Sequence, residues 1–300
     1  MEIRLLKEAI SSPDVKAVSF DIFDTLLSRP CLFPYVLFRI AGKRCGFEGD
    51  FESVRREAEH KARSNCPEGD DDVTFDTICE ELSLMIGAEE VRPLKQAEMR
   101  AEYDYLYPRK PIDDVFHYAL ETGKQVIIVS DMYLPVSFLE AVLRKNGYTG
   151  YQKIYISNEY LLTKHTKRLF GRVIDDLAKE GISPSEILHI GDNAYADVQN
   201  ASECGLKTFH IECGVSAMKK SKWFRTLEQP LCEENLFWLG LIANFFFDPF
   251  RERKEPMPET LDGLIKALLQ SRDQTQLNLI TMLCRDRIFP EEILSFMKKA

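Results

Sequence analysis

Two aspartates, Asp21 and Asp24, lie in the apolar stretch SFDIFDTLLSRP, which covers residues 19–30. Carboxylates in such a stretch need partners, because burying an unpaired charge is costly. The preceding run, VKAVSF (Val15–Phe20), is apolar on both faces and is typical of a buried parallel strand. Asp21 and then Thr25 are therefore expected at the end of a strand, where their side chains could do chemistry.

Further polar residues follow later apolar runs of the same kind. They are Ser130 and Asp131, Lys164, Asp192 and Asn193, with Asp197 one helical turn further on. In a parallel α/β sheet the carboxyl ends of the strands form one edge, where ligands bind. Each of these residues alone also fits a helix cap or a turn, but their convergence favours a site.

The residue types at this edge indicate a particular chemistry. Clustered carboxylates repel one another, and hard oxygen ligands suit Mg²⁺. A lysine surrounded by hydroxyl donors suits a phosphoryl group, whose negative charge needs positive partners. The sequence therefore indicates metal-assisted phosphoryl transfer, with a carboxylate available as the nucleophile.

The elements that must position these residues follow from apolar patterning. Short apolar runs predict parallel strands at Val15–Phe20, Gln125–Val129, Ile154–Ile156, Ile187–Ile190 and Thr208–Ile211. Between them, helices are expected at Asp113–Glu121, Pro135–Asn146, Thr166–Glu180 and Ala194–Cys204. Strands alternating with helices predict an α/β fold with a doubly wound parallel sheet and right-handed crossovers.

Two helix-rich tracts interrupt or extend this pattern. The first runs from about Leu32 to Tyr107, and its basic stretch from Arg55 to Arg63 favours a solvated helix face. The second covers 214–300, with helices expected at Glu234–Phe247, Thr260–Gln270, Gln274–Cys284 and Pro290–Lys299. The expected organisation is therefore a core of residues 1–31 and 108–213, a helical insertion at 32–107 and a C-terminal extension at 214–300.

The composition limits the classes of function. The 300 residues carry a net charge of −9, which argues against a nucleic-acid partner. The eight cysteines form no C-x-x-C pair or zinc spacing, and the N-terminus lacks the apolar core of a signal peptide. A cytoplasmic protein with reduced thiols is expected. The apolar run Leu236–Phe247 is too short to span a bilayer, so no membrane contact is expected.

Four segments together resemble a known family. FDIFDTLL, VIIVSD, SNEYLLTK and HIGDNAYAD are similar, in order, to the four motifs of the haloacid-dehalogenase-like (HAD) hydrolase superfamily. The resemblance covers roughly residues 13–212. It implies a Rossmann-like core, with the tract 32–107 as a helical cap inserted after the first strand.

The resemblance also implies roles for individual residues. Asp21 would be the nucleophile and form an aspartyl-phosphate, while Thr25, Ser130 and Lys164 would bind the phosphoryl oxygens. The implied ligands of Mg²⁺ are Asp21, the backbone carbonyl of Phe23, and Asp192. Asp197 and Asn193 would support the metal ligands or orient the lysine.

Phe23 departs from the family's D-x-D-x-T motif. Phosphatases of the superfamily carry an aspartate there, which protonates the leaving group, and phenylalanine cannot transfer a proton. Three interpretations follow. The first is a phosphatase or phosphotransferase that acts on a small phosphorylated metabolite and uses Asp24, Asp131 or water to transfer the proton. The others are a 2-haloacid dehalogenase and a catalytically impaired module that binds metal and phosphate. Against the dehalogenase, Asp192 keeps the metal carboxylate and Asp131 stands where dehalogenases usually have asparagine.

Some residues have an ordinary structural interpretation beside the functional one. Arg29, soon after the first motif, is expected either to contact an anionic substrate or to be a surface or capping residue. Asp131 suits a substrate contact or a helix N-cap, and Asn193 suits a cap. His189, inside a predicted strand, is expected to be structural. The aromatic C-terminal helices are expected to pack within the chain, with a homo-oligomeric or other protein contact as the alternative.

Overall fold

The computed structural model describes residues 2–227, 232–252 and 256–299, which form two compact units. Unit 1 comprises residues 1–28, 58–84 and 108–212, and unit 2 comprises 29–57, 85–107 and 213–300. The expected division into core, insertion and extension has three parts. In the structure the insertion is shared between the two units, and the extension groups with part of it.

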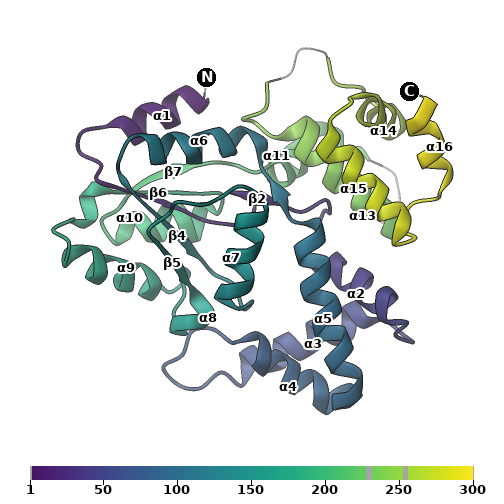
Figure 1. The fold of residues 1–300 in the computed structure, drawn as a ribbon, viewed down its shortest axis with the longest axis horizontal. Helices are drawn as coiled ribbons and strands as arrows, with labels where there is room; N and C mark the ends of the chain where they lie inside the picture. The colour runs from purple at the N-terminus through teal and green to yellow at the C-terminus, as the bar shows by residue number, and fades with distance from the viewer. Residues whose placement is uncertain (1, 228–231, 253–255, 300) are drawn as a thin grey trace. The chain divides into compact units, whose positions relative to one another are not determined.

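A five-stranded parallel sheet forms the centre of unit 1 (Figure 1). Its order is β5-β4-β1-β6-β7. The strands are β1 (Ala17–Phe20), β4 (Gln125–Ser130), β5 (Lys153–Ile156), β6 (Ile187–Gly191) and β7 (Lys207–His210). Phe20 at the end of β1 lies in register with Ile128 and Ile190. The predicted α/β class and all five predicted strands are confirmed, with ends that differ by one or two residues.

Helices cover both faces of this sheet (Figure 1). They are α1 (Glu2–Ser11), α6 (Lys110–Glu121), α7 (Val136–Lys145), α8 (Ser157–Tyr160), α9 (Arg168–Ala178) and α10 (Ala201–Glu203). The π-helical stretch η3 (Ala194–Asn200) precedes α10, where one regular helix was expected, and η2 (Pro184–Glu186) precedes β6. Ile127 and Val129 of β4 pack with α9, whereas Phe20 contacts Phe116 of α6. Alternate strand residues therefore face opposite layers.

Unit 2 is helical. It holds η1 (Pro34–Val36), α2 (Leu37–Cys45), α5 (Ala88–Tyr105), α11 (Gly214–Lys220), α12 (Lys222–Arg225), α13 (Glu233–Ile242), η4 (Ala243–Phe247), α14 (Leu261–Gln270), α15 (Gln274–Arg285) and α16 (Glu292–Lys299). The boundary between the units falls inside α3 (Phe51–Ser64) and α4 (Phe75–Ile86). Two short strands, β2 (Leu27–Ser28) and β3 (Tyr107–Pro108), lie where the chain passes from one unit to the other.

The apolar helix α13 is buried within unit 2. Trp238 of α13 stacks on Phe289 with ring centroids 4.0 Å apart, and Leu239 is fully buried. A Cβ on Gly240 would lie 2.3 Å from the Cys31 backbone, so glycine permits a close approach. Packing of this apolar helix within its own chain is confirmed. The alternative protein contact stays a prediction.

The prediction of a solvated basic face on α3 is partly wrong. Arg55 is fully buried, and its guanidinium forms an ion pair with Glu98 of α5 at 2.8 Å. Arg55 was expected to be solvated, but its ion pair with the distant residue Glu98 allows it to lie in the core.

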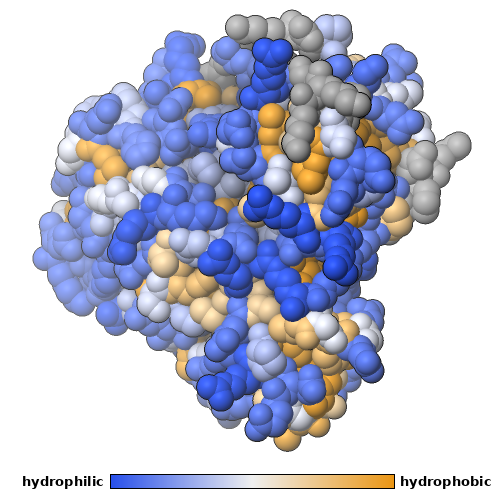
Figure 2. All heavy atoms as spheres, turned by 45° about the vertical axis from the view of Figure 1, so that its right-hand side comes forward, coloured by the Kyte–Doolittle hydropathy of each residue, from blue (hydrophilic) through white to orange (hydrophobic). Residues whose placement is uncertain are grey.

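Hydrophilic and hydrophobic residues are interspersed on the face that Figure 2 shows. Among the described residues, the large hydrophobic side chains with the greatest exposure are Leu84, Tyr195 and Leu5. No helix in the described ranges is long and apolar enough to cross a membrane.

Candidate active site

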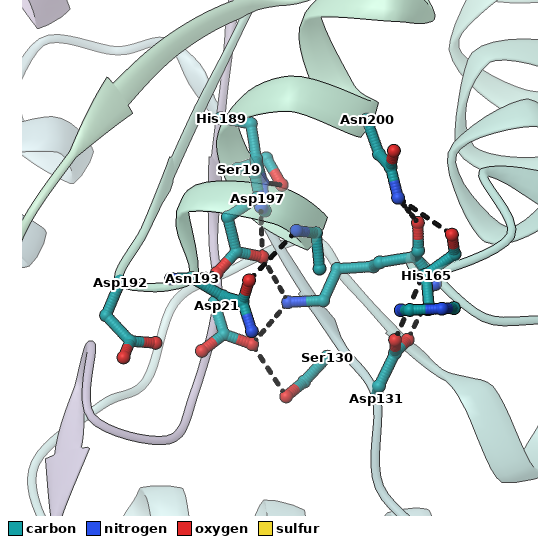
Figure 3. A network of polar contacts seen from close by, with 12 residues as sticks. Ser19, Asp21, Ser130, Asp131, His165, His189, Asp192, Asn193, Asp197 and Asn200 are labelled. Atoms are coloured by element: carbon teal, nitrogen blue, oxygen red, sulfur yellow. Dashed lines mark hydrogen bonds and ion pairs between the residues drawn. The ribbon is translucent and has the colours of Figure 1, made fainter.

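Asp21 lies one residue beyond β1, where its backbone N–H donates to Ile190 O of β6 at 3.0 Å. The residue is 5% exposed. Ser130 Oγ donates to Asp21 Oδ1 at 2.8 Å (Figure 3). Lys164 Nζ donates to the same oxygen at 2.6 Å. Burial raises the pKa of Asp21, while Lys164 opposes this rise. The carboxylate expected to be the nucleophile therefore has two donors on one oxygen, and no described residue donates to the other.

Lys164 joins Asp21 to Asp197. Its ammonium lies 2.6 Å from Asp21 Oδ1 and 2.5 Å from Asp197 Oδ1, and all three side chains are buried. Burial alone would lower the pKa of Lys164, but the carboxylates of Asp197, Asp21 and Asp131 outweigh it and raise this pKa. The lysine is therefore held as a cation at the strand edge.

Asp197 is fixed by groups from three directions. Oδ1 also contacts His189 Nε2 at 3.1 Å, and Oδ2 accepts from the Asn193 backbone N–H at 3.0 Å. Burial would raise the pKa of Asp197, but Lys164 and His189 lower it. A Cβ on Gly191 would lie 2.3 Å from Asp197 Cγ, so this position requires glycine.

His189 belongs to this network and was not predicted to do so. It is fully buried in β6, and its Nδ1 lies 2.8 Å from Ser19 Oγ of β1. The histidine thus bridges β1 to Asp197. The strand period offered a signal, because Ser19 in β1 and Asp21 just beyond it are two residues apart and so are expected on the same side of the sheet.

Asp192 lies beside Asp21 at the same edge (Figure 3). Ligand oxygens of Asp21, Asp192 and Asp197 lie within 4.8 Å of one another. Burial, followed by the charges of Asp24 and Asp21, raises the pKa of Asp192 well above its ordinary value. Within the described part of the chain no group donates a hydrogen bond to this carboxylate. These oxygens suit a divalent cation, whereas Asp197 is already engaged with Lys164 and the backbone.

Thr25 carries a buried hydroxyl close behind Asp21 in the chain. The residue is 0% exposed, and its Oγ1 has no hydrogen-bond partner among the described residues. An orphaned buried hydroxyl is uncommon in native proteins and calls for an explanation. A phosphoryl oxygen bound there would provide the partner.

The loop between Asp21 and Thr25 makes a tight turn. Asp24 has a positive φ of 57°, and its N–H donates to Leu27 O at 2.7 Å. Phe23 forms a β-bridge with Leu27. Metal binding by the Phe23 carbonyl stays a prediction, as does any substrate contact by Asp24.

Asp131 holds the backbone of the lysine. Its two carboxylate oxygens accept from the N–H groups of Lys164 and His165, at 2.8 and 3.3 Å. Burial raises the pKa of Asp131, with Lys164 acting in the opposite direction. The predicted N-cap role is wrong, because Pro135 is the N-cap of α7. Substrate contact by Asp131 stays a prediction.

Asn193 caps η3 as predicted, since its Oδ1 accepts from the N–H groups of Tyr195 and Ala196.

Arg29 belongs to unit 2, where its buried guanidinium is paired with Glu102 at 3.0 Å. The alternative of a surface or capping residue is therefore wrong for Arg29. Its contact with a substrate stays a prediction.

Arg109 is a buried residue that sequence reasoning missed. Its guanidinium donates to Asp24 O at 2.8 Å, to Ile211 O at 3.1 Å and to Glu212 O at 2.7 Å. It thus ties the turn after Asp21 to the chain beyond β7. Its three carbonyl acceptors carry no sequence signature, which explains why the pattern did not reveal it.

Comparisons with known proteins bear on this site. Residues 161–226 match the family model described as HAD-hydrolase-like, and this segment includes Lys164, Asp192 and Asp197. No curated protein matches the sequence. Similar solved structures include the HAD-hydrolase YfnB from Bacillus subtilis bound to magnesium, at 19% identity over 66% of this chain and 88% of that chain, with a TM-score of 0.48. The HAD phosphatase from Thermococcus onnurineus is 19% identical over 66% and 86% of the two chains, with a TM-score of 0.46. The L-2-haloacid dehalogenase RSc1362 is 20% identical over the same shares, also with a TM-score of 0.46.

Proposed function

We propose that the chain is a HAD-like, Mg²⁺-dependent hydrolase acting on a small phosphorylated molecule through Asp21, a proposal supported by the match of residues 161–226 to the HAD-hydrolase-like family model. The observation that carries this proposal is the position of Asp192. Its half-buried carboxylate lies beside Asp21 without a donor from the described residues, an arrangement that favours a bound cation. A dehalogenase, which needs no metal, would have no use for this carboxylate.

Asp21, Asp192 and the Phe23 carbonyl are the proposed Mg²⁺ ligands. The ion would neutralise the repulsion among the carboxylates and the negative charge of the phosphoryl group. Lys164 and Ser130 would bind phosphoryl oxygens, as would the orphaned Thr25 hydroxyl.

The proposed reaction has two steps. A carboxylate oxygen of Asp21 attacks phosphorus, a new O–P bond forms, and the bond to the leaving group breaks with its electron pair. Water then attacks the aspartyl-phosphate, which releases inorganic phosphate and restores Asp21. Attack by an alcohol of a second substrate in place of water would make the protein a phosphotransferase.

Phe23 limits the proton transfers in both steps. A positioned acid or base contributes about 10²–10⁴ in rate, and phenylalanine supplies none. Asp131 is a poor replacement, because both its oxygens accept backbone hydrogen bonds. We therefore expect faster turnover on acyl and aryl phosphates, whose leaving groups depart without protonation, than on alkyl phosphates.

The second candidate is a catalytically impaired module that binds metal and phosphate. The replacement of the usual aspartate by Phe23 favours it, since this change removes proton transfer and leaves Asp21, Asp192 and Lys164 in place.

A phosphatase screen tests the proposal. Acetyl phosphate and p-nitrophenyl phosphate would be supplied to the wild type with Mg²⁺ and with EDTA. We expect turnover that requires Mg²⁺, disappears in Asp21→Asn and persists in Asp175→Asn, a control on the exposed side of α9.

Phe23→Asp restores the missing acid in the same assay. We expect it to raise turnover of alkyl phosphates by up to about 10²–10⁴. Absence of turnover by the wild type on every phosphate, with Mg²⁺ and phosphate still bound, would favour the binding module. Halide release from a 2-haloacid in EDTA would favour the dehalogenase.

A further inference from the structure

The segment Leu161–Lys167, here called the lysine loop, carries Lys164 between α8 and α9. Lys164 must bring one nitrogen within 2.6 Å of Asp21 and 2.5 Å of Asp197. A loop has no strand ladder to fix its backbone, so other groups must hold it. The contacts that do so identify the residues on which the position of Lys164 depends.

Two of these contacts come from the sheet edge. Asp131, just beyond β4, accepts from the N–H groups of Lys164 and His165. Asn200 Nδ2, at the end of η3, donates to Lys164 O at 3.1 Å and to His165 O at 2.7 Å. Together they fix the centre of the lysine loop.

The third contact comes from a distant part of the sequence. Asp71 lies in the turn between α3 and α4, 95 residues before Thr166 of the lysine loop. Its N–H donates to Leu161 O at 2.9 Å, and its Oδ2 accepts from Thr166 Oγ1 at 2.5 Å. Oδ1 accepts from Nη1 of Arg168, the first residue of α9, at 2.9 Å. Asp71 therefore contacts both ends of the lysine loop.

The neighbouring Asp72 reaches the segment that carries the other donor to Asp21. Its buried carboxylate accepts from Ser157 Oγ, and the Met132 N–H donates to the same Ser157 oxygen at 2.7 Å. Met132 lies two residues beyond Ser130. The turn Asp71–Asp72 thus contacts the segments that carry Lys164 and Ser130, the two donors to Asp21 Oδ1.

We propose that Asp71, a residue of the helical insertion, is a positioning residue that holds the lysine loop so that Lys164 reaches Asp21. This inference rests on the proposed role of Lys164 in phosphoryl transfer. A misplacement of about 1 Å in a catalytic group can reduce the rate roughly 10²-fold, so anchoring of the loop has a large effect. Asp71 accepts these bonds as a carboxylate. Burial raises its pKa, but the hydrogen bonds from Thr166 and Arg168 outweigh burial and lower this pKa below its ordinary value.

Asp71→Asn tests the inference, because asparagine has the same shape but replaces one acceptor oxygen with a donor. Asp70→Asn is the matched control, since it removes the same charge one residue earlier and Asp70 makes no side-chain bond to the lysine loop among the described residues. The first readout is hydrogen exchange at the Lys164 and His165 amides. We expect at least a tenfold acceleration in Asp71→Asn, with no change in β6 or in the melting temperature.

The second readout is turnover of p-nitrophenyl phosphate with Mg²⁺. We expect kcat to fall at least tenfold in Asp71→Asn while KM changes less than twofold. In a Lys164→Met background the same substitution should have no further effect, because Asp71 acts through Lys164.

Three results would overturn the inference: unchanged exchange of the lysine loop in Asp71→Asn, equal acceleration in Asp70→Asn, or a full additional loss of kcat in the Lys164→Met background. If the wild type turns over no phosphate, the proposed function fails separately. Accelerated exchange in Asp71→Asn would then still support the anchoring of Lys164 by Asp71.

Discussion

Gly191 shows how one missing side chain sets the geometry of the candidate site. It ends β6, and Asp197 packs where a Cβ would lie. Because Asp197 holds Lys164, anything that displaces its carboxylate also moves the lysine.

We predict that Gly191→Ala reduces the free energy of unfolding by about 1–3 kcal/mol through overpacking. It should also abolish Mg²⁺-dependent turnover, because Lys164 loses one of its two carboxylates. Urea denaturation and the p-nitrophenyl phosphate assay measure the two effects.

Gly171→Ala is the matched control for this substitution. Gly171 lies inside α9, and no atom lies within 4 Å of the position that a Cβ would occupy, so alanine should stabilise the protein by about 1 kcal/mol. Equal stability and turnover in Gly191→Ala and the wild type would contradict the packing argument.

At the scale of single residues, the sequence predicts site residues that follow a strand better than site residues that lie inside one. Asp21, Ser130, Lys164 and Asp197 come together because parallel strands share one carboxyl edge. His189 was not predicted to join them, because its partner Ser19 lies 170 residues away and depends on the pairing of β1 with β6.

At the scale of elements, α3 and α5 are joined by a buried ion pair. Arg55 Nε and Nη2 donate to the two oxygens of Glu98 at 2.8 and 2.9 Å, with side-chain exposures of 0% and 3%. Such a pair costs desolvation when it forms, and it leaves an uncompensated charge when one partner is removed.

We predict that Glu98→Gln destabilises the protein by about 3–5 kcal/mol, because Arg55 stays buried without its counter-charge. The double variant Arg55→Met, Glu98→Leu should recover most of this loss, because it removes both charges and keeps apolar volume. Urea unfolding of the single and double variants measures the coupling. If the double variant loses as much stability as the sum of the two single substitutions, the pair is not coupled.

The strands could be predicted from the sequence because a short apolar run bounded by turn residues is typical of a strand buried on both faces. The packing of the helices could not. In α3 the pattern favoured a solvated basic face, yet Arg55 is in the core, because a charged residue reveals burial only through its partner on α5. The anchoring turn Asp71–Asp72 likewise resembles an ordinary polar turn until the lysine loop is placed against it.

At the scale of the whole molecule, unit 2 contains a hydrophobic core built from distant parts of the chain. Leu32, Ile40 and Tyr105 from the insertion are buried in the same cluster as Trp238 and Leu264 from the C-terminal extension. The insertion and the extension therefore share this core.

We predict that removal of residues 214–300 exposes the insertion residues 32–57 and 85–107, because their apolar side chains lose their packing partners. Limited proteolysis should then cut these segments while the sheet of unit 1 is still protected. Removal of α16 alone should have a much smaller effect. A truncated protein whose insertion resists protease would contradict the prediction.

The unmatched hydroxyl of Thr25 links folding to ligand affinity. A buried polar group without a partner costs about 1–3 kcal/mol, and the folded chain bears this cost before any ligand arrives. An oxyanion that accepts the hydrogen bond would remove the cost and gain the same amount in binding. Because the gain exists only in the folded state, such an anion would also act as a pharmacological chaperone, selecting folded molecules from a partly unfolded population.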